Sequence, residues 1–127
     1  MQLFFRSMIF LFTIVSNLSQ AGNNELFVEF SDVSLHEGRQ LWIDNCKACH
    51  AYGTAGAPIP MDAEDWRERV LKTSQVLYIH ALDGFYGPDD TIMPAKGGNP
   101  DLTIRQVTLA VDYMVALAKF YIKKQLK

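Results

Sequence analysis

The sequence has few cysteines, little basic charge and no internal repeats, and each shortage narrows what the protein can be. Only two cysteines occur among the 127 residues, and a domain this small usually depends on a disulfide, a metal or another organising group, so the question is which of these the pair serves. Neither cysteine lies near residue 21, which excludes the usual bacterial lipid attachment site. The formal net charge is −2, without a basic stripe, and gives no support for nucleic-acid binding.

Long apolar runs are also missing, and the one run near the N-terminus is short. It extends from Met8 to Val15 behind a single positive charge at Arg6, and small residues follow at Ser19 and Ala21. This layout is typical of a secretory signal peptide cleaved after Ala21, and the run is well short of the roughly 20 residues that span a bilayer. The sequence therefore predicts an exported, periplasmic protein, with an uncleaved anchor as the alternative.

The rest of the chain is long enough for one small domain and reads as all-α. We expect residues 1–21 to be the signal peptide, 22–33 to be a short extended lead-in and 34–127 to form the domain. Glycine and proline are too dense for regular structure over residues 84–100. A non-periodic loop of that length inside a compact domain is usually functional or disordered.

Capping residues and apolar spacing predict four helices. Ser34 and Glu37 form a capping-box pair at the start of a first helix that runs into the cysteine segment. Asp62 and Ser74 precede two short helices, and the second of these should end at Gly84. A last helix follows a second capping-box pair, Thr103 with Gln106, and its apolar residues repeat at intervals of three and four.

Cys46, Cys49 and His50 form a Cys-x-x-Cys-His motif, for which four chemistries compete. A zinc site needs about four ligands, and the remaining candidates, His36 and His80, are poorly spaced. A thioredoxin-like redox pair needs a βαβ setting that is missing, and a structural disulfide leaves His50 without a role. Haem uses all three residues, because the thiols can form thioethers to its vinyl groups and the histidine can bind the iron.

The second axial ligand decides the function, because haem with one protein ligand can bind gas or peroxide, whereas haem with two mostly carries electrons. Met93 is the preferred candidate, since its Gly/Pro-rich loop can wrap around the haem edge and Pro94 stiffens the backbone beside it. His80 is the competing candidate. Met61 follows the motif too closely, and Met114 lies on an apolar helix face, where methionine most often fills space.

Further motifs follow one another along nearly the whole chain from Ser34 onward. They are Gly38 with Leu41, CKACHAYGTAGAP from Cys46 to Pro58, DWRERV with Trp66 and Arg69, YIHALDGFYG from Tyr78, MPAKGG from Met93, and DLT…VDYMVALAKFY. This ordered set resembles the class I c-type cytochromes and, within them, the cytochrome c5-like group. Asn99 stands where many members of that group have a cysteine of a second pair, so the loop after Met93 is expected to depend on packing alone.

The resemblance implies the small cytochrome c fold, with helices and Gly/Pro-rich loops wrapped around one covalently attached haem c. The N- and C-terminal helices would cross near Gly38, and the Pro58 carbonyl would accept the Nδ1–H of His50 and so fix the ring. Trp66 and Arg69 would lie beside a haem propionate. The residues expected to line the pocket without reacting are Tyr78, Leu82 and Tyr86.

Axial ligation by His50 and Met93 implies an electron carrier and not an enzyme. The resemblance implies a monomer, at most peripherally associated with a membrane, that shuttles single electrons from a quinol-oxidising complex to a terminal oxidase or reductase. Its partners would dock at the haem edge, ringed by Ala55, Ala57, Ile59, Met93, Pro94 and Ala95. The alternatives are a haem enzyme or gas-binding protein with an open or labile sixth iron position, and a subunit of a larger oxidase.

Overall fold

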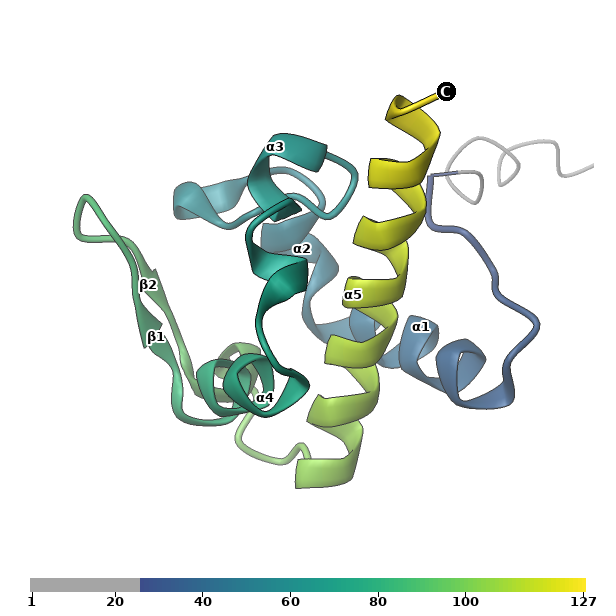
Figure 1. The fold of residues 1–127 in the computed structure, drawn as a ribbon. Helices are drawn as coiled ribbons and strands as arrows, with labels where there is room; N and C mark the ends of the chain where they lie inside the picture. The colour runs from purple at the N-terminus through teal and green to yellow at the C-terminus, as the bar shows by residue number, and fades with distance from the viewer. Residues whose placement is uncertain (1–25) are drawn as a thin grey trace, which may run out of the picture.

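A computed structural model of the chain describes residues 26–127, and Figure 1 shows their arrangement. The predicted signal peptide therefore lies outside the described residues. In chain order the elements are α1 (Val33–Asn45), α2 (Lys47–His50), the 3₁₀ turn η1 (Thr54–Gly56), α3 (Ala63–Trp66), η2 (Arg69–Leu71), α4 (Ser74–Asp83), β1 (Phe85–Tyr86), β2 (Ile92–Met93), η3 (Ala95–Gly98) and α5 (Ile104–Gln125). The predicted all-α class is confirmed, with one short strand pair added to it.

The long helix α5 forms the axis of the fold, and α1, α3 and α4 all pack against it (Figure 1). The crossing of α1 and α5 is close because Gly38 has no side chain. A Cβ atom at Gly38 would lie only 2.2 Å from the carbonyl oxygen of Leu109 and 3.2 Å from the Cβ of Tyr113. The crossing near Gly38 that the family resemblance implied is therefore present in the structure.

Two groups of buried side chains hold the helices together. The larger lies between α1, α3, α5 and the segment before α1, and consists of Phe27, Trp42, Trp66, Ala110, Tyr113, Met114, Leu117 and Ala118. Trp42 is its centre, with the ring of Phe27 edge-on at 5.2 Å and the ring of Tyr113 at 5.8 Å. The smaller group joins α4 to α5 through Ala81, Leu102, Val107 and Val111, and Met93 packs against it.

The first helix begins earlier than the sequence predicted. The Asp32 side chain accepts the backbone N–H groups of Ser34 and Leu35, so α1 starts at Val33. The predicted capping box of Ser34 with Glu37 is therefore wrong. A carboxylate just before a helix satisfies free N–H groups and also favours the positive end of the helix dipole, which gives Asp32 the advantage over a serine.

The helix predicted behind Asp62 is interrupted. Asp62 does cap it, but α3 ends at Trp66, and a separate 3₁₀ turn follows at η2. The guanidinium of Arg69 donates to the Asp65 carbonyl, which in a continuous helix would accept the backbone N–H of Arg69 itself. Side-chain bonding thus replaces the helical bond at this point.

The remaining predicted helix ends agree closely with the structure. Thr73 caps α4 in place of the adjacent Ser74, and Gly84 ends it with a φ of +87°. Thr103 and Gln106 form the predicted capping box at the start of α5. Local sequence signals therefore located three of the four predicted helix starts, and the end of α4, to within a residue.

The lead-in before α1 packs along α5, where the sequence predicted only an extended segment. Tyr113 and Tyr121 on α5 donate their hydroxyls, each over 3.0 Å, to the carbonyls of Val28 and Leu26 respectively. Arg39 on α1 donates from Nε to the Phe27 carbonyl at 2.8 Å. The segment follows α5 back toward α1 in Figure 1 and contributes Phe27 to the core.

The Gly/Pro-rich loop contains more regular structure than predicted. Strands β1 and β2 pair in antiparallel fashion, with Phe85 opposite Met93, and form a hairpin that projects from the helices (Figure 1). Asp89 and Asp90 form its tip, both with a φ of +57°, and the Thr91 N–H donates to the Pro88 carbonyl. Positive φ at both central residues gives a turn whose twist matches paired strands.

Candidate functional site

The Cys-x-x-Cys-His motif occupies a single helical turn that directly continues α1. Cys46 ends α1 and begins α2, and the His50 N–H donates to the Cys46 carbonyl at 3.0 Å. Positions i, i+3 and i+4 of a helix lie on one face, so the two thiols and the imidazole share a surface. Cys46 and Cys49 are not joined by a disulfide.

The thiol of Cys46 is a poor candidate for redox exchange. Burial, with a smaller effect from Cys49, raises the pKa of the Cys46 thiol to about 11. Because thiol–disulfide exchange needs a thiolate, reactive pairs usually have lowered values. This environment does not resemble that of a thioredoxin-like pair.

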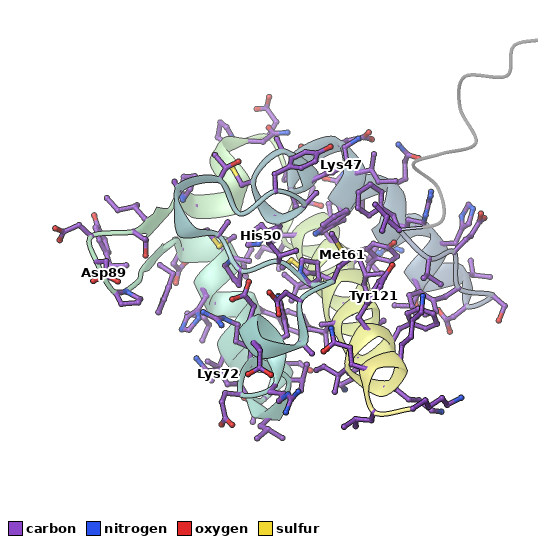
Figure 2. The ribbon with its side chains drawn as sticks, turned by 90° about the horizontal axis from the view of Figure 1, so that it is seen from above. Lys47, His50, Met61, Lys72, Asp89 and Tyr121 are labelled. Atoms are coloured by element: carbon purple, nitrogen blue, oxygen red, sulfur yellow. The ribbon has the colours of Figure 1, made fainter. Side chains whose placement is uncertain are left out.

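His50 lies near the centre of the molecule (Figure 2), with only 7% of its surface exposed. Its Nδ1 lies 2.9 Å from the Pro58 carbonyl oxygen, which can only accept, so Nδ1 carries the proton. Burial lowers the pKa of His50. The hydrogen bond to Pro58 raises this pKa, and the charge of Arg69 lowers it. The ring is therefore held neutral, with its Nε2 lone pair available to a metal.

A cavity beside His50 brings together residues from distant parts of the chain. Its walls come from the motif, from α4, from the loop after the hairpin and from α5, and its lining residues are Cys46, His50, Ala81, Met93, Lys96, Gly97, Leu102, Val107, Ala110, Val111 and Met114. The lining is mostly apolar, which suits the face of a porphyrin. Cys46, His50 and Met93, three of the four residues predicted to hold haem, thus share one cavity.

The other candidates for the second axial position lie elsewhere. The His80 ring stacks on Phe85 at 4.2 Å, and Nε2 of His36 lies 3.0 Å from Oε1 of Glu29. Met61 packs against the larger core group and is not part of the cavity lining. Met114, however, does line the cavity from α5, which its description as a space-filling residue did not lead us to expect.

Met93 is held in place by close backbone contacts with the end of α4. A Cβ atom on Gly84 would lie 2.9 Å from the Met93 carbonyl oxygen and 3.1 Å from the Ala95 nitrogen. The pairing of Phe85 with Met93 extends that contact into the hairpin. The loop that presents Met93 is therefore positioned by a glycine, as well as stiffened by the proline that follows.

Trp66 and Arg69 lie near the site, and their chemistry suits a carboxylate. Trp66 is 2% exposed, and its indole N–H has no hydrogen-bond partner among the described residues. A buried unpaired donor is costly, so an acceptor supplied by a bound group would stabilise it. Arg69 is close enough to His50 for its charge to lower the pKa of the imidazole. These residues fit a haem propionate.

Three residues predicted to line the pocket differ from that expectation. Tyr86 is 80% exposed on the hairpin. Tyr78 donates its hydroxyl to Asp112 on α5, and Leu82 packs against the smaller core group. None of the three belongs to the cavity lining.

The loop after Met93 is fastened by hydrogen bonds, so the prediction that it depends on packing alone is wrong. The Asn99 amide donates to Oδ1 of Asn45 at 2.8 Å, and Asn45 donates to the Leu41 carbonyl. The Lys96 ammonium donates to the carbonyls of Pro100 and Leu102. Asn99 thus links the loop to the residue before Cys46. The side-chain pairing spans 54 positions, which no local signal could reveal.

Comparisons with known proteins support the class of protein that this fold and site indicate. A family model described as "Cytochrome C oxidase, cbb3-type, subunit III" matches residues 33–114. Three relatives are each named cytochrome c-555. That of Prosthecochloris aestuarii is 44% identical over 84 residues, 64% of this chain and 85% of the relative. That of Chlorobaculum thiosulfatiphilum is 39% identical over 82 residues, 65% of this chain and 94% of the relative.

The third relative, from Chlorobaculum tepidum, is 38% identical over 82 residues, 65% of this chain and 75% of the relative. The chain therefore belongs to this cytochrome c family, as a class I c-type cytochrome. It is a mono-haem electron-transfer protein with covalently bound c-type haem, and it works with redox partners. Within residues 26–127, no helix is long and apolar enough to cross a membrane.

Proposed function

We propose that this cytochrome is an exported electron carrier whose iron is bound by His50 and Met93. The observation that supports the proposal is that His50 and Met93 line the same cavity although 43 positions separate them in the chain. Haem supplies the redox chemistry, since its iron can hold or release one electron. The residues of the chain attach the haem, orient it and shield it from water.

Cys46 and Cys49 would hold the haem by thioethers, and the Pro58 carbonyl orients His50. Trp66 and Arg69 would bind a propionate. If His50 and Met93 both held the iron of a bound haem, no position would be left open to a substrate, which favours a carrier over an enzyme. The Met93 thioether and the apolar lining both favour ferrous iron and thus raise the reduction potential.

Residues 1–21 act as the signal peptide, which directs residues 22–127 to the periplasm. There the protein receives electrons from a quinol-oxidising complex and delivers them to a terminal oxidase or reductase. Partners dock at the haem edge, at a rim of Ala55, Ala57, Ile59, Met93, Pro94 and Ala95. Of these residues, Ala55, Pro94 and Ala95 are exposed, as a rim requires. The contacts are small and short-lived, because a carrier must leave after transfer.

A fixed subunit of a larger oxidase is the second candidate, because the matching family model is described by such a subunit. The two functions differ in the assembly that forms after export. A carrier behaves as a free monomer in gel filtration of periplasmic extracts. A fixed subunit co-purifies with other chains in a constant ratio.

Spectroelectrochemical titration of the mature, haem-loaded protein tests the carrier function. We expect one reversible one-electron wave, with low-spin spectra at both ends and no hysteresis, because neither axial ligand leaves. Addition of peroxide should leave the ferric spectrum unchanged over the time of a titration. Hysteresis, a high-spin end state or rapid reaction with peroxide would instead indicate an enzyme or gas-binding protein.

A further inference from the structure

The peptide group between Pro58 and Ile59 is hydrogen-bonded on both sides. Its carbonyl accepts the Nδ1–H of His50 at 2.9 Å. Its N–H, which belongs to Ile59, donates to Oδ2 of Asp65 at 2.8 Å. One amide therefore connects the imidazole of His50 to a carboxylate that does not touch the ring.

Such an arrangement strengthens the bond to His50. A hydrogen bond from an amide N–H to a carboxylate is charge-assisted and roughly twice as strong as a neutral one. It draws the amide dipole toward the carboxylate and leaves more negative charge on the carbonyl oxygen, and linked hydrogen bonds strengthen one another in this way. The Pro58 carbonyl becomes a better acceptor, and His50 becomes a more basic ligand.

We infer that Asp65 is a positioning residue for His50. Through the Pro58–Ile59 peptide, its carboxylate strengthens the ring hydrogen bond, favours ferric iron and lowers the reduction potential. The inference rests on the proposed role of His50 as an axial ligand. It assigns the lowering of the potential to Asp65, in opposition to the Met93 thioether and the apolar lining.

The structure holds Asp65 firmly enough for this role. It lies on α3, whose first turn is capped by Asp62. Its own backbone carbonyl accepts from the Arg69 guanidinium, so the residue is fixed at the backbone as well as at the side chain.

The substitution Asp65→Asn tests the inference, because an amide oxygen can still accept the Ile59 N–H while the charge is removed. We expect the ferrous-to-ferric ratio at a fixed ambient potential to rise about threefold, which is about 28 mV because tenfold is 59 mV for one electron. The ring N–H proton of His50, measured by NMR in the ferrous protein, should move upfield as its hydrogen bond weakens. Asp65→Ala should show at least the same shifts.

Removal of any nearby negative charge also raises the potential, so Glu68→Gln is the matched control. Glu68 is exposed on the same segment of chain, and its loss should give a smaller rise and leave the His50 proton unmoved. Equal potentials for Asp65→Asn and Glu68→Gln, with an unmoved His50 proton in both, would overturn the inference alone. A wild-type protein whose iron is not bound by His50 would instead remove the proposed function and this inference together.

Discussion

At the residue scale, His50 combines burial with one fixed ring hydrogen bond, and both act on its second nitrogen. The carbonyl of Pro58 keeps the proton on Nδ1, and burial lowers the pKa of the imidazole. A metal therefore meets a neutral, correctly oriented ligand without first displacing a proton. The ordering of this ring is a property of the chain itself.

The two buried tryptophans test the proposed propionate contact. Both indole N–H groups are buried and unpartnered among the described residues, but only Trp66 is proposed to gain an acceptor from haem. In the haem-loaded protein, Trp66→Phe should lower the free energy of unfolding by about 1.5–3 kcal/mol more than Trp42→Phe does. This difference is the net contribution of a hydrogen bond to a charged group. Urea unfolding of both variants provides the comparison.

Trp42→Phe is the matched control because both substitutions remove the same volume from one core group. The Trp42 ring already makes its contacts with Phe27 and Tyr113, whichever group the site holds. Equal costs for the two variants would mean that the Trp66 N–H has no charged partner, and would contradict the propionate assignment.

At the element scale, the crossing of α1 and α5 carries a pH-dependent ion pair. Arg105 on α5 donates from Nη1 and Nη2 to the two carboxylate oxygens of Glu37 on α1, at 2.6 and 2.8 Å. This contact holds the pKa of Glu37 below its ordinary value of 4.5. The stabilisation is therefore fully present above that value and is lost as the pH falls through the lowered one.

Arg105→Gln should lower the stability slightly near neutral pH and flatten the decline over the acidic range by the same amount, and the effect should be small because both side chains are exposed. Denaturant unfolding at a series of pH values below 6 measures the slope. Arg67→Gln, which removes an exposed ion pair with Glu64 within one turn, is the control. An unchanged slope for Arg105→Gln would show that the pair does not form in solution.

Helix ends could be predicted from the sequence where the signal is local. The start of α5 depends on Thr103 and Gln106, whose side chains are three residues apart. The end of α4 depends on Gly84, whose positive φ suits glycine. The prediction failed at α1, where Asp32 competes with Ser34 for the same N–H groups. It also failed after Trp66, because the Arg69 side chain takes a carbonyl that the helix would have used.

At the scale of the whole molecule, the motif and the likeness to a family predicted the class of protein and one closely packed crossing. The His50–Pro58 bond followed from the same resemblance, whereas Met93 was selected from its place in the Gly/Pro-rich loop. The Asn45–Asn99 bond and the Ile59–Asp65 bond could not be predicted, since neither residue type specifies a partner at that distance in the chain. The place of Met114 in the cavity lining could not be predicted either, because its position on the apolar face of α5 is that of an ordinary core residue.

The packing of residues 26–32 against α5 also belongs to the scale of the whole molecule. Tyr121 belongs to the apolar spacing of the last helix, yet its hydroxyl and that of Tyr113 donate to backbone carbonyls of the lead-in. Phe27 then fills the core beside Trp42. A periodic pattern predicts which face of a helix is buried, but not which segment covers it.

Optical spectra of the purified, haem-loaded protein test the central claim most directly, with Met93→Ala and Met114→Leu measured alongside. Both methionines line the cavity, so the pair separates ligation from packing. We predict a low-spin ferric spectrum with the weak far-red sulfur-to-iron band in the wild type and in Met114→Leu, and loss of that band in Met93→Ala. A band that survives in Met93→Ala, or that is absent from the wild type, would contradict ligation by Met93 and with it the carrier function.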